Sequence, residues 1–245
     1  MIKRAAIILA SGKGTRMKSD MPKVLHQVGS KTMVRHVLDT VQAAGIDNIV
    51  VVVGYKAEEV MASLGEGPTY VLQSEQLGTG HAVSVVKDSF VDFSGTIMVL
   101  AGDVPLITQE TIENLFLEHE AQGAAVTVLT AISDNPTGYG RIIRGTEGTV
   151  EGIVEEKDAS SKERLIQEIN TGTYCFDATV LFALIDKVNN HNSQGEYYLT
   201  DVISLAKQAG HKVIAVQVSD ISETIGVNTL EQLVMAEQIY QLRGI

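Results

Sequence analysis

Short apolar runs alternate with helical segments through the first half of the chain, and this alternation restricts the fold more than any other feature. Runs short enough for buried strands cover residues 5–9, 48–53, 69–73, 96–101 and 124–130. Segments with helical patterning lie between or after them at residues 32–44, 56–64, 80–87 and 108–122. Continuous apolar strands joined by amphipathic helices predict an α/β fold, in which a Rossmann-like and mostly parallel sheet is covered by helices on both faces.

The pattern changes after Pro136. Residues 141–144 and 149–155 are typical of antiparallel strands around a glycine-containing turn. The later elements are expected to be a short polar helix at 160–168, strands at 173–176 and 212–218, and a final helix at 228–243. We expect the antiparallel part to form a small substrate-side lobe that packs beside the main sheet.

The charge of the chain restricts its partners. The formal net charge is −11, which argues against a nucleic-acid or anionic-membrane partner. Residues 1–23 nevertheless carry +5 and the other 222 residues carry −16, so a small anionic ligand is favoured. Cys175 is the only cysteine, which excludes an intramolecular disulfide, and no apolar run approaches the ~20 residues of a membrane span. We expect a soluble, cytoplasmic protein.

The cations near the start of the chain lie in a loop of small residues that follows the first strand. Residues 9–25 read Leu-Ala-Ser-Gly-Lys-Gly-Thr-Arg-Met-Lys-Ser-Asp-Met-Pro-Lys-Val-Leu. Small residues let backbone N–H groups approach anionic oxygens, and the cationic side chains add positive charge where phosphates would lie. A Walker A loop needs a glycine directly before Lys18, and a dinucleotide loop needs a third glycine at position 17. Met17 excludes both.

This loop resembles the signature Leu-x-x-Gly-x-Gly-Thr-Arg-Met followed by Pro-Lys-Val-Leu of sugar-1-phosphate nucleotidylyltransferases. Later segments narrow the resemblance to the uridyltransferase (pyrophosphorylase) domain of bacterial bifunctional N-acetylglucosamine-1-phosphate uridyltransferases, along nearly the whole chain. The sequence departs from that family at Ser11, where the family usually has Ala, and at Ala101, where a larger residue is often found.

The resemblance also implies a domain organisation. A pyrophosphorylase domain is expected at residues 1–228, and residues 229–245 are expected to form a C-terminal helix that begins the linker to a β-helix acetyltransferase domain. The sequence contains no hexapeptide repeats of the kind that build such a β-helix. Because the family assembles its trimer largely through that domain, a monomer and a weak homo-oligomer both remain open.

Asp103 and Asn228 are the candidate metal ligands. Asp103 follows the apolar strand 96–101, at the end of the sheet where ligands gather, and a carboxylate near phosphates suits Mg²⁺. The alternative is a turn aspartate that bonds its own backbone. Asn228 precedes the last helix, and a helix cap with Glu231 at the third helical position would explain it without a metal. The resemblance implies that Asp103 and Asn228 hold Mg²⁺ together.

The segment at residues 73–81, Gln-Ser-Glu-Gln-Leu-Gly-Thr-Gly-His, is the candidate base-binding loop. Gln73 has both a donor and an acceptor, as the pairing edge of a pyrimidine requires, and Gly78 lets a base lie against the backbone. From the residues alone, a polar loop before a helix is the alternative. The segment closely resembles the family's uracil-reading loop. His81 is expected to be structural, because no carboxylate–His–nucleophile arrangement accompanies it.

Three residues are candidates for sugar binding. Gly140 lies in a loop that resembles the family loop whose backbone meets the N-acetyl group of the sugar. Glu155 and Asn170 can bond sugar hydroxyls, although a surface or turn role is the alternative for each alone. Together with residues 194–201, they resemble enzymes for N-acetylglucosamine 1-phosphate rather than glucose- or mannose-specific relatives.

The resemblance implies that UMP is transferred from UTP to N-acetylglucosamine 1-phosphate, giving UDP-N-acetylglucosamine and pyrophosphate with Mg²⁺ as cofactor. Arg16 is expected to hold the departing phosphates, and Lys23 the sugar phosphate and the α-phosphate. The substrate contacts are expected at Leu9, Ala10, Ser11, Gly12, Lys23, Gln73, Gly78, Thr79, Ala101, Gly102, Asp103, Gly140, Glu155, Asn170 and Asn228.

Two other functions are compatible with this pattern. One is the same chemistry on another sugar 1-phosphate or base, for example by a glucose-1-phosphate uridylyl- or thymidylyltransferase. The other is a nucleotide-sugar-binding regulator without turnover. The presence of Arg16, Lys23, Asp103 and Asn228 together argues against the regulator, because binding alone would not need all four.

Overall fold

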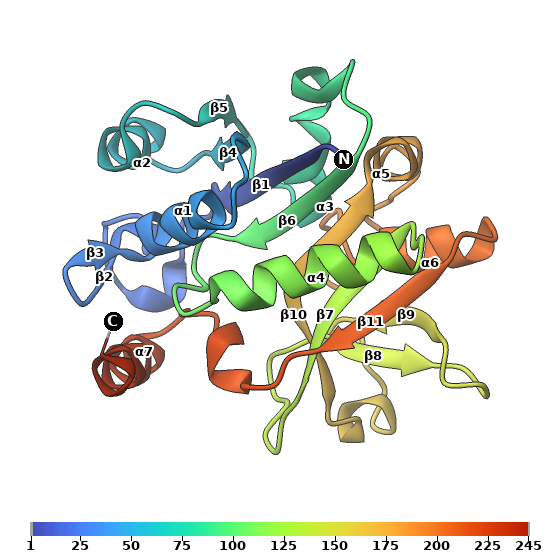
Figure 1. Ribbon diagram of the computed structural model, residues 1–245. Coiled ribbons are helices and arrows are strands. Elements are labelled where there is room, and N and C mark those ends of the chain that lie inside the picture. Colours follow the sequence, from blue (N-terminus) through green and yellow to red (C-terminus); the bar gives the residue numbers. More distant parts are fainter. Residues whose placement is uncertain (1, 245) are drawn as a thin grey trace.

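A computed structural model describes residues 2–244 and contains one large mixed sheet (Figure 1). The strands, in spatial order, are β11 (Val213–Gln217), β7 (Val126–Ile132), β10 (Glu168–Asp177), β6 (Thr96–Ala101), β1 (Arg4–Ala10), β4 (Asn48–Val53) and β5 (Thr69–Leu72). Neighbours are parallel except at β10, which is antiparallel to both β6 and β7. The carboxyl ends of β1, β4, β5 and β6 therefore meet at one edge.

Helices cover both faces of this sheet, as the sequence predicts. One face carries α1 (Met33–Ala43), α2 (Ala57–Leu64) and α4 (Gln109–Ala121), and the other carries α3 (Thr79–Ser84), α5 (Ala178–Ile185) and α6 (Asp201–Gln208). Strand β1 supplies Ala6 and Ile8 to the first core and Ala5 and Ile7 to the second, which is the two-residue alternation of a strand buried on both sides.

The small antiparallel part predicted at residues 141–144 and 149–155 is confirmed. It is a hairpin of β8 (Arg141–Arg144) and β9 (Val150–Val154) that joins the main sheet where Arg141 pairs with Ile169. Strand β10 itself runs through the main sheet between β6 and β7. The short β2 (Gln27–Val28) and β3 (Lys31–Thr32) form a separate two-stranded sheet.

The helix predicted at residues 160–168 is wrong. Only a 3-10 turn forms there, at Glu163–Leu165, and none of its residues is buried. A polar segment without an apolar stripe has nothing to pack against the body, and the chain becomes extended at Ile166 before entering β10. The helices α5 and α6 were not predicted from the sequence.

The last helix, α7 (Leu230–Arg243), packs against the small sheet and against the cationic loop after β1, the candidate phosphate loop within residues 9–25. Its residue Ala236 shares an apolar cluster with Met17 and Val28, and Tyr240 contacts His36 edge-on with ring centroids 5.2 Å apart. The helix therefore supports the loop that contains Arg16, through the buried Met17.

Asn228 does not cap α7, so the capping alternative for this residue is wrong. The cap is Thr229, whose hydroxyl accepts from the Gln232 N–H (3.3 Å) while the Gln232 side chain accepts from the Thr229 N–H (3.2 Å). The reciprocal pair is a capping box that begins one residue later than expected. This shift leaves the Asn228 side chain free for other contacts.

We expect Thr229→Ala to lower the free energy of unfolding by about 1 kcal/mol, because it removes the capping hydroxyl. Asn228→Ala should cost less, since the capping box stays intact. Urea unfolding of the two variants checks this order. A larger loss in Asn228→Ala than in Thr229→Ala would contradict the assignment of the cap.

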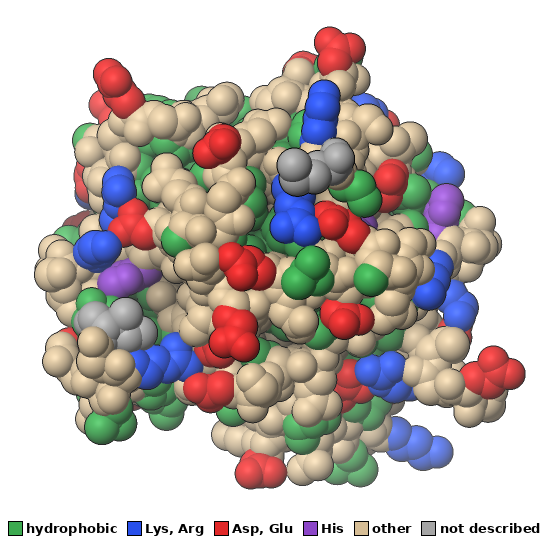
Figure 2. Space-filling model, viewed as in Figure 1, with side chains coloured by type: hydrophobic (Ala, Val, Ile, Leu, Met, Phe, Trp, Pro, Cys, Tyr) green, Lys and Arg blue, Asp and Glu red, His purple; other side chains and the backbone are tan. Residues whose placement is uncertain are grey.

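The charges on one face of the molecule and the character of its helices can be read from the structure. On the face shown in Figure 2, acidic and basic side chains are interspersed and form no broad cationic area. Within residues 2–244, no helix has the length and apolar character needed to cross a membrane.

Candidate active site

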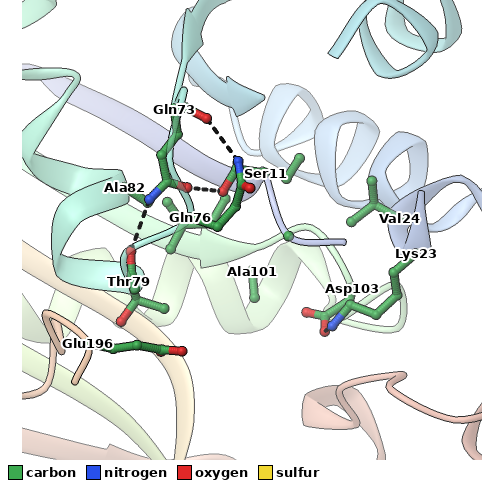
Figure 3. A pocket seen from close by; sticks show the side chains of 14 residues that line it. Ser11, Lys23, Val24, Gln73, Gln76, Thr79, Ala82, Ala101, Asp103 and Glu196 are labelled. Atoms are coloured by element: carbon green, nitrogen blue, oxygen red, sulfur yellow. Dashed lines mark hydrogen bonds and ion pairs between the residues drawn. The ribbon is translucent and has the colours of Figure 1, made fainter. Parts of the chain in front are cut away.

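Two adjoining cavities lie at the carboxyl ends of the parallel strands and share Ala101 and Asp103. The first, about 310 Å³, is lined by Leu9, Ala10, Ser11, Gly12, Lys23, Val24, Gln73, Gln76, Gly78, Thr79, Ala82, Ala101, Asp103 and Glu196 (Figure 3). The second, about 270 Å³, includes Arg16, Tyr139, Gly140, Glu155, Asn170, Thr171, Gly226 and Asn228 in its wall. Residues that are far apart in the sequence thus come together in one composite site.

Gly102 is the one predicted contact that does not line either cavity. Its N–H donates to the Leu9 carbonyl (2.9 Å), and a Cβ at this position would lie 3.1 Å from that oxygen. The glycine therefore lets the segment after β6 pack closely on the end of β1.

The phosphate loop needs a glycine at position 14. Gly14 has φ +67° and begins the 3-10 turn Thr15–Met17, and a Cβ there would collide with the Lys23 side chain. The absence of a side chain at Gly14 lets Lys23 cross the loop toward Asp103. Met17 is buried beneath the loop and anchors it to α7.

The centre of the site is a cluster of Lys23, Asp103, Asn228 and Arg16. The Lys23 ammonium donates to Asp103 Oδ2 and to Asn228 Oδ1 (2.8 Å), and Arg16 Nη2 donates to the same Asn228 oxygen (2.8 Å). The Lys23 and Asp103 side chains are only 16% and 13% exposed. Figure 3 shows the ammonium beside the carboxylate at the mouth of the cavity. The two oxygens predicted to bind a metal therefore converge on one point, where a cation already lies.

A backbone hydrogen bond brings the two halves of this cluster together. The Val227 N–H donates to the Asp103 carbonyl (2.9 Å), which joins the segment after β6 to the segment before α7. Gly226 lies beside the carboxylate, since a Cβ on it would be 4.0 Å from Asp103 Oδ2. Residues 125 positions apart in the sequence meet through this contact.

Hydrogen bonds hold the candidate base-binding loop, residues 73–81, at the first cavity. Gln73 is only 2% exposed, and its amide contacts Ser11, Gly78 and His81. The loop is also fixed to the segment 194–201, because the Gly80 N–H donates to the Tyr197 carbonyl (2.7 Å) and the Leu199 N–H donates to Thr79 Oγ1 (3.0 Å). His81 contacts the Gln73 amide through Nδ1 (3.0 Å).

The second cavity presents a carboxylate and an amide. Glu155 Oε1 accepts from the Thr200 hydroxyl (3.0 Å), and Asn170 Nδ2 donates to the Tyr174 hydroxyl (2.7 Å). The Gly140 carbonyl accepts from the Asn170 N–H (2.9 Å), so the two residues are fixed relative to each other. Asn170 Oδ1 also accepts from the Gly172 N–H (3.2 Å), so these neutral partners hold both side chains at the wall of the second cavity.

Desolvation raises the pKa of Glu155, and the carboxylates of Asp201, Asp158 and Glu196 add to this effect. A glutamate with a raised pKa holds its proton more tightly in the folded protein than in the unfolded chain. The folded protein therefore loses stability as the pH rises from about 4.3, the ordinary pKa of glutamate, to the raised pKa. We expect Glu155→Gln to gain stability relative to the parent between pH 4 and pH 8, as measured by urea unfolding.

Glu147 is an exposed glutamate, and Glu147→Gln is unfolded under the same conditions for comparison. A difference between Glu155→Gln and the parent that did not change with pH would contradict the desolvation of Glu155.

Sequence reasoning missed several lining residues. Gln76 lies three residues after Gln73 and donates to the Gln73 carbonyl (3.0 Å), but a polar residue in a polar loop gives no separate signal. Glu196 and Thr200 lie in the segment 194–201, yet only the fold shows that Glu196 lines the first cavity and that Thr200 donates to Glu155.

The donor set fits a hard divalent cation of the Mg²⁺ type. Among residues 2–244 no group of three or more His, Cys, Asp or Glu side chains could hold a metal. The converging Asp103 and Asn228 oxygens offer two hard ligands and leave the other positions to phosphate oxygens and water, which is the coordination that Mg²⁺ commonly takes.

The chain was compared with known proteins. A family model described as "Nucleotidyl transferase" matches residues 5–226. The bifunctional protein GlmU of Limosilactobacillus fermentum is 54% identical over 243 residues, 99% of this chain and 53% of that protein, and GlmU of Bacillus licheniformis is 52% identical over 245 residues, 100% and 54%. The chain thus spans about half the length of these relatives.

Two solved structures share the fold. A UDP-glucose pyrophosphorylase in complex with UDP-glucose has a TM-score of 0.77 at 18% identity, covering 99% of this chain and 100% of that one. A protein from Bacillus anthracis, described as a glucose-1-phosphate thymidylyltransferase in complex with sucrose, also has a TM-score of 0.77, at 23% identity with 96% and 94% covered. The family match over residues 5–226 shows that the chain belongs to the nucleotidyl transferase family.

Proposed function

We propose that this chain transfers UMP from UTP to N-acetyl-α-D-glucosamine 1-phosphate, forming UDP-N-acetylglucosamine and pyrophosphate. The observation that carries the proposal is the cluster of Lys23, Asp103, Asn228 and Arg16 at the junction of two cavities. One cavity has a loop suited to a base, and the other has a carboxylate and an amide suited to sugar hydroxyls. The identity of 51–54% to GlmU proteins supports the choice of UTP and this sugar.

The proposed reaction requires the protein to align two anions. The sugar phosphate oxygen is already an anion when it attacks the α-phosphorus, so a general base is unnecessary. Lys23 neutralises the attacking phosphate and the α-phosphate, and Arg16 holds the departing pyrophosphate. Both cations donate to Asn228 Oδ1 at 2.8 Å, which gathers their charges at the junction of the two cavities.

Asp103 and Asn228 are the residues that would hold Mg²⁺. When bound, the ion supplies positive charge that neutralises phosphate oxygens and orients the triphosphate. The chain's own part is to present a carboxylate and an amide oxygen that converge on one point.

Pyrophosphate release tests the proposal. The purified chain is incubated with Mg²⁺, one nucleotide (UTP, dTTP or CTP) and one sugar phosphate (N-acetylglucosamine, glucose or mannose 1-phosphate). We expect the highest kcat/KM for UTP with N-acetylglucosamine 1-phosphate. A preference for another pair would reassign the substrates. Binding of a nucleotide sugar without pyrophosphate release from any pair would indicate a binding protein without turnover.

A further inference from the structure

The side-chain amide of Gln73 has its orientation fixed by a backbone carbonyl. Gln73 Nε2 lies 3.1 Å from the carbonyl oxygen of Gly78. A carbonyl can only accept a hydrogen bond, so the amide nitrogen must face Gly78 and the amide oxygen must face the other way. The assignment of nitrogen and oxygen therefore follows from the chemistry of the neighbour.

Ser11 holds the oxygen end of this amide. Its hydroxyl donates to Gln73 Oε1, as Figure 3 shows. Ser11 is itself rigid, because its carbonyl accepts from the Tyr55 N–H (3.0 Å) and the adjacent Gly54 has no room for a side chain, whose Cβ would lie 2.7 Å from the same oxygen. The Ser11 hydroxyl thus links the residue that follows β1 to Gln73 in the candidate base-binding loop.

His81 holds the nitrogen end. Its Nδ1 lies 3.0 Å from Gln73 Nε2, so Nδ1 accepts the second amide hydrogen and the ring proton lies on Nε2. Both amide hydrogens and one lone pair of Oε1 are now used within the protein. The single remaining capacity of Gln73 is the second lone pair of Oε1, at the wall of the first cavity.

We propose that Ser11 and His81 are positioning residues that hold Gln73 as a pure acceptor and thereby set the preference for uracil over cytosine. Uracil presents an N3–H donor at the centre of its pairing edge, whereas cytosine presents a lone pair at N3, which the Gln73 oxygen would repel. The proposal rests on the proposed nucleotide substrate. It assigns a role to Ser11, a position at which this chain differs from the usual residue of the family that it resembles.

The test compares kcat/KM for UTP with kcat/KM for CTP in each variant, by pyrophosphate release. Ser11→Ala removes the tether at Oε1, and His81→Phe leaves an amide hydrogen without an acceptor. Each should raise KM for UTP and lower the UTP-to-CTP ratio about fivefold, the effect of one neutral hydrogen bond, while kcat stays close to the parent value.

Two further variants separate positioning from general damage. His81→Asn places an oxygen near the position of Nδ1 and should restore most of the ratio. Ser89→Ala makes the same chemical change as Ser11→Ala at an exposed site outside residues 73–81 and should leave the ratio unchanged. Both values of kcat/KM are measured on the same preparation, so an inactive unfolded fraction lowers both equally and does not change their ratio.

The outcomes distinguish this inference from the proposed function. Binding of UDP and CDP, measured by calorimetry, gives a second ratio that needs no turnover. If the parent protein discriminates between the bases but Ser11→Ala and His81→Phe keep the parent ratio, the positioning role is wrong and the proposed function stands. If the parent binds neither nucleotide and releases no pyrophosphate, the proposed function fails.

Discussion

Asp103→Asn is expected to lower turnover by about 10²–10³-fold, the usual effect of removing one preorganised charge from an active site. The change keeps the size of the side chain and an oxygen that can still accept from Lys23. It removes the negative charge that a hard divalent cation prefers and that balances the Lys23 ammonium. The measurement is pyrophosphate release as a function of Mg²⁺ concentration, and the half-maximal concentration should rise.

The fold should tolerate this change. Asp103 lies after the end of β6, and its carbonyl still accepts from the Val227 N–H, so urea unfolding should differ little from the parent. Asp92→Asn, at an exposed turn, is the matched control and should leave both turnover and Mg²⁺ dependence unchanged. Full turnover of Asp103→Asn at low Mg²⁺ would refute the role of this carboxylate.

The sequence predicts the sheet well because its strands are buried on both faces. Strands such as β1 and β4 read as continuous apolar runs, and their predicted limits lie within a residue or so of the observed ones. Helix α5 was missed for the same physical reason. Its sequence Ala-Thr-Val-Leu-Phe-Ala-Leu-Ile is apolar on nearly all sides, so it has no polar face to reveal the helical period.

Strand β10 shows a second limit of pattern reading. Only residues 173–176 look like a strand in the sequence, but the element spans Glu168–Asp177. Its first part contains Asn170 beside a register shift against β7, where polar residues turn toward the second cavity. Functional residues interrupt the apolar pattern at that point, so the pattern underestimates the strand.

The candidate site was predictable as a set of segments but not as a set of contacts. Residues after parallel strands meet because the strand ends share an edge, so Ser11, Gln73 and Asp103 could be expected together. The bond between Gln73 and His81 has no such signal, because a spacing of eight residues across a loop and a helix start implies no contact. The position of the Lys23 ammonium between Asp103 and Asn228 depends on the path that Gly14 allows and is likewise visible only in three dimensions.

That position of Lys23 leads to the second large effect. The Lys23 ammonium lies at the point on which the two candidate metal ligands converge. A lysine and a divalent cation cannot share this point, so they compete for it. The phosphates of a nucleotide would draw the ammonium away and bring their own oxygens to the metal, which couples metal binding to nucleotide binding.

We expect Lys23→Met, which keeps the length of the side chain but removes its charge, to bind Mn²⁺ about tenfold more tightly than the parent in the absence of nucleotide. This factor lies within the usual 5- to 150-fold range for coupling between two sites. Mn²⁺ serves as a spectroscopic substitute for Mg²⁺, and its binding is followed by electron paramagnetic resonance. Turnover of the same variant should fall about 10²–10³-fold, because the charge that aligns the two phosphates is gone.

Opposite effects on metal affinity and turnover distinguish a competing cation from a merely structural lysine. Lys31→Met, which removes an exposed lysine paired with Asp39, is the matched control and should change neither quantity. The double variant Lys23→Met with Asp103→Asn should lose the gain in Mn²⁺ affinity, because the Asp103 carboxylate is the candidate ligand that the ammonium contacts. Weaker Mn²⁺ binding by Lys23→Met than by the parent would mean that the lysine supports the metal position instead of occupying it, and competition between the two cations would have to be abandoned.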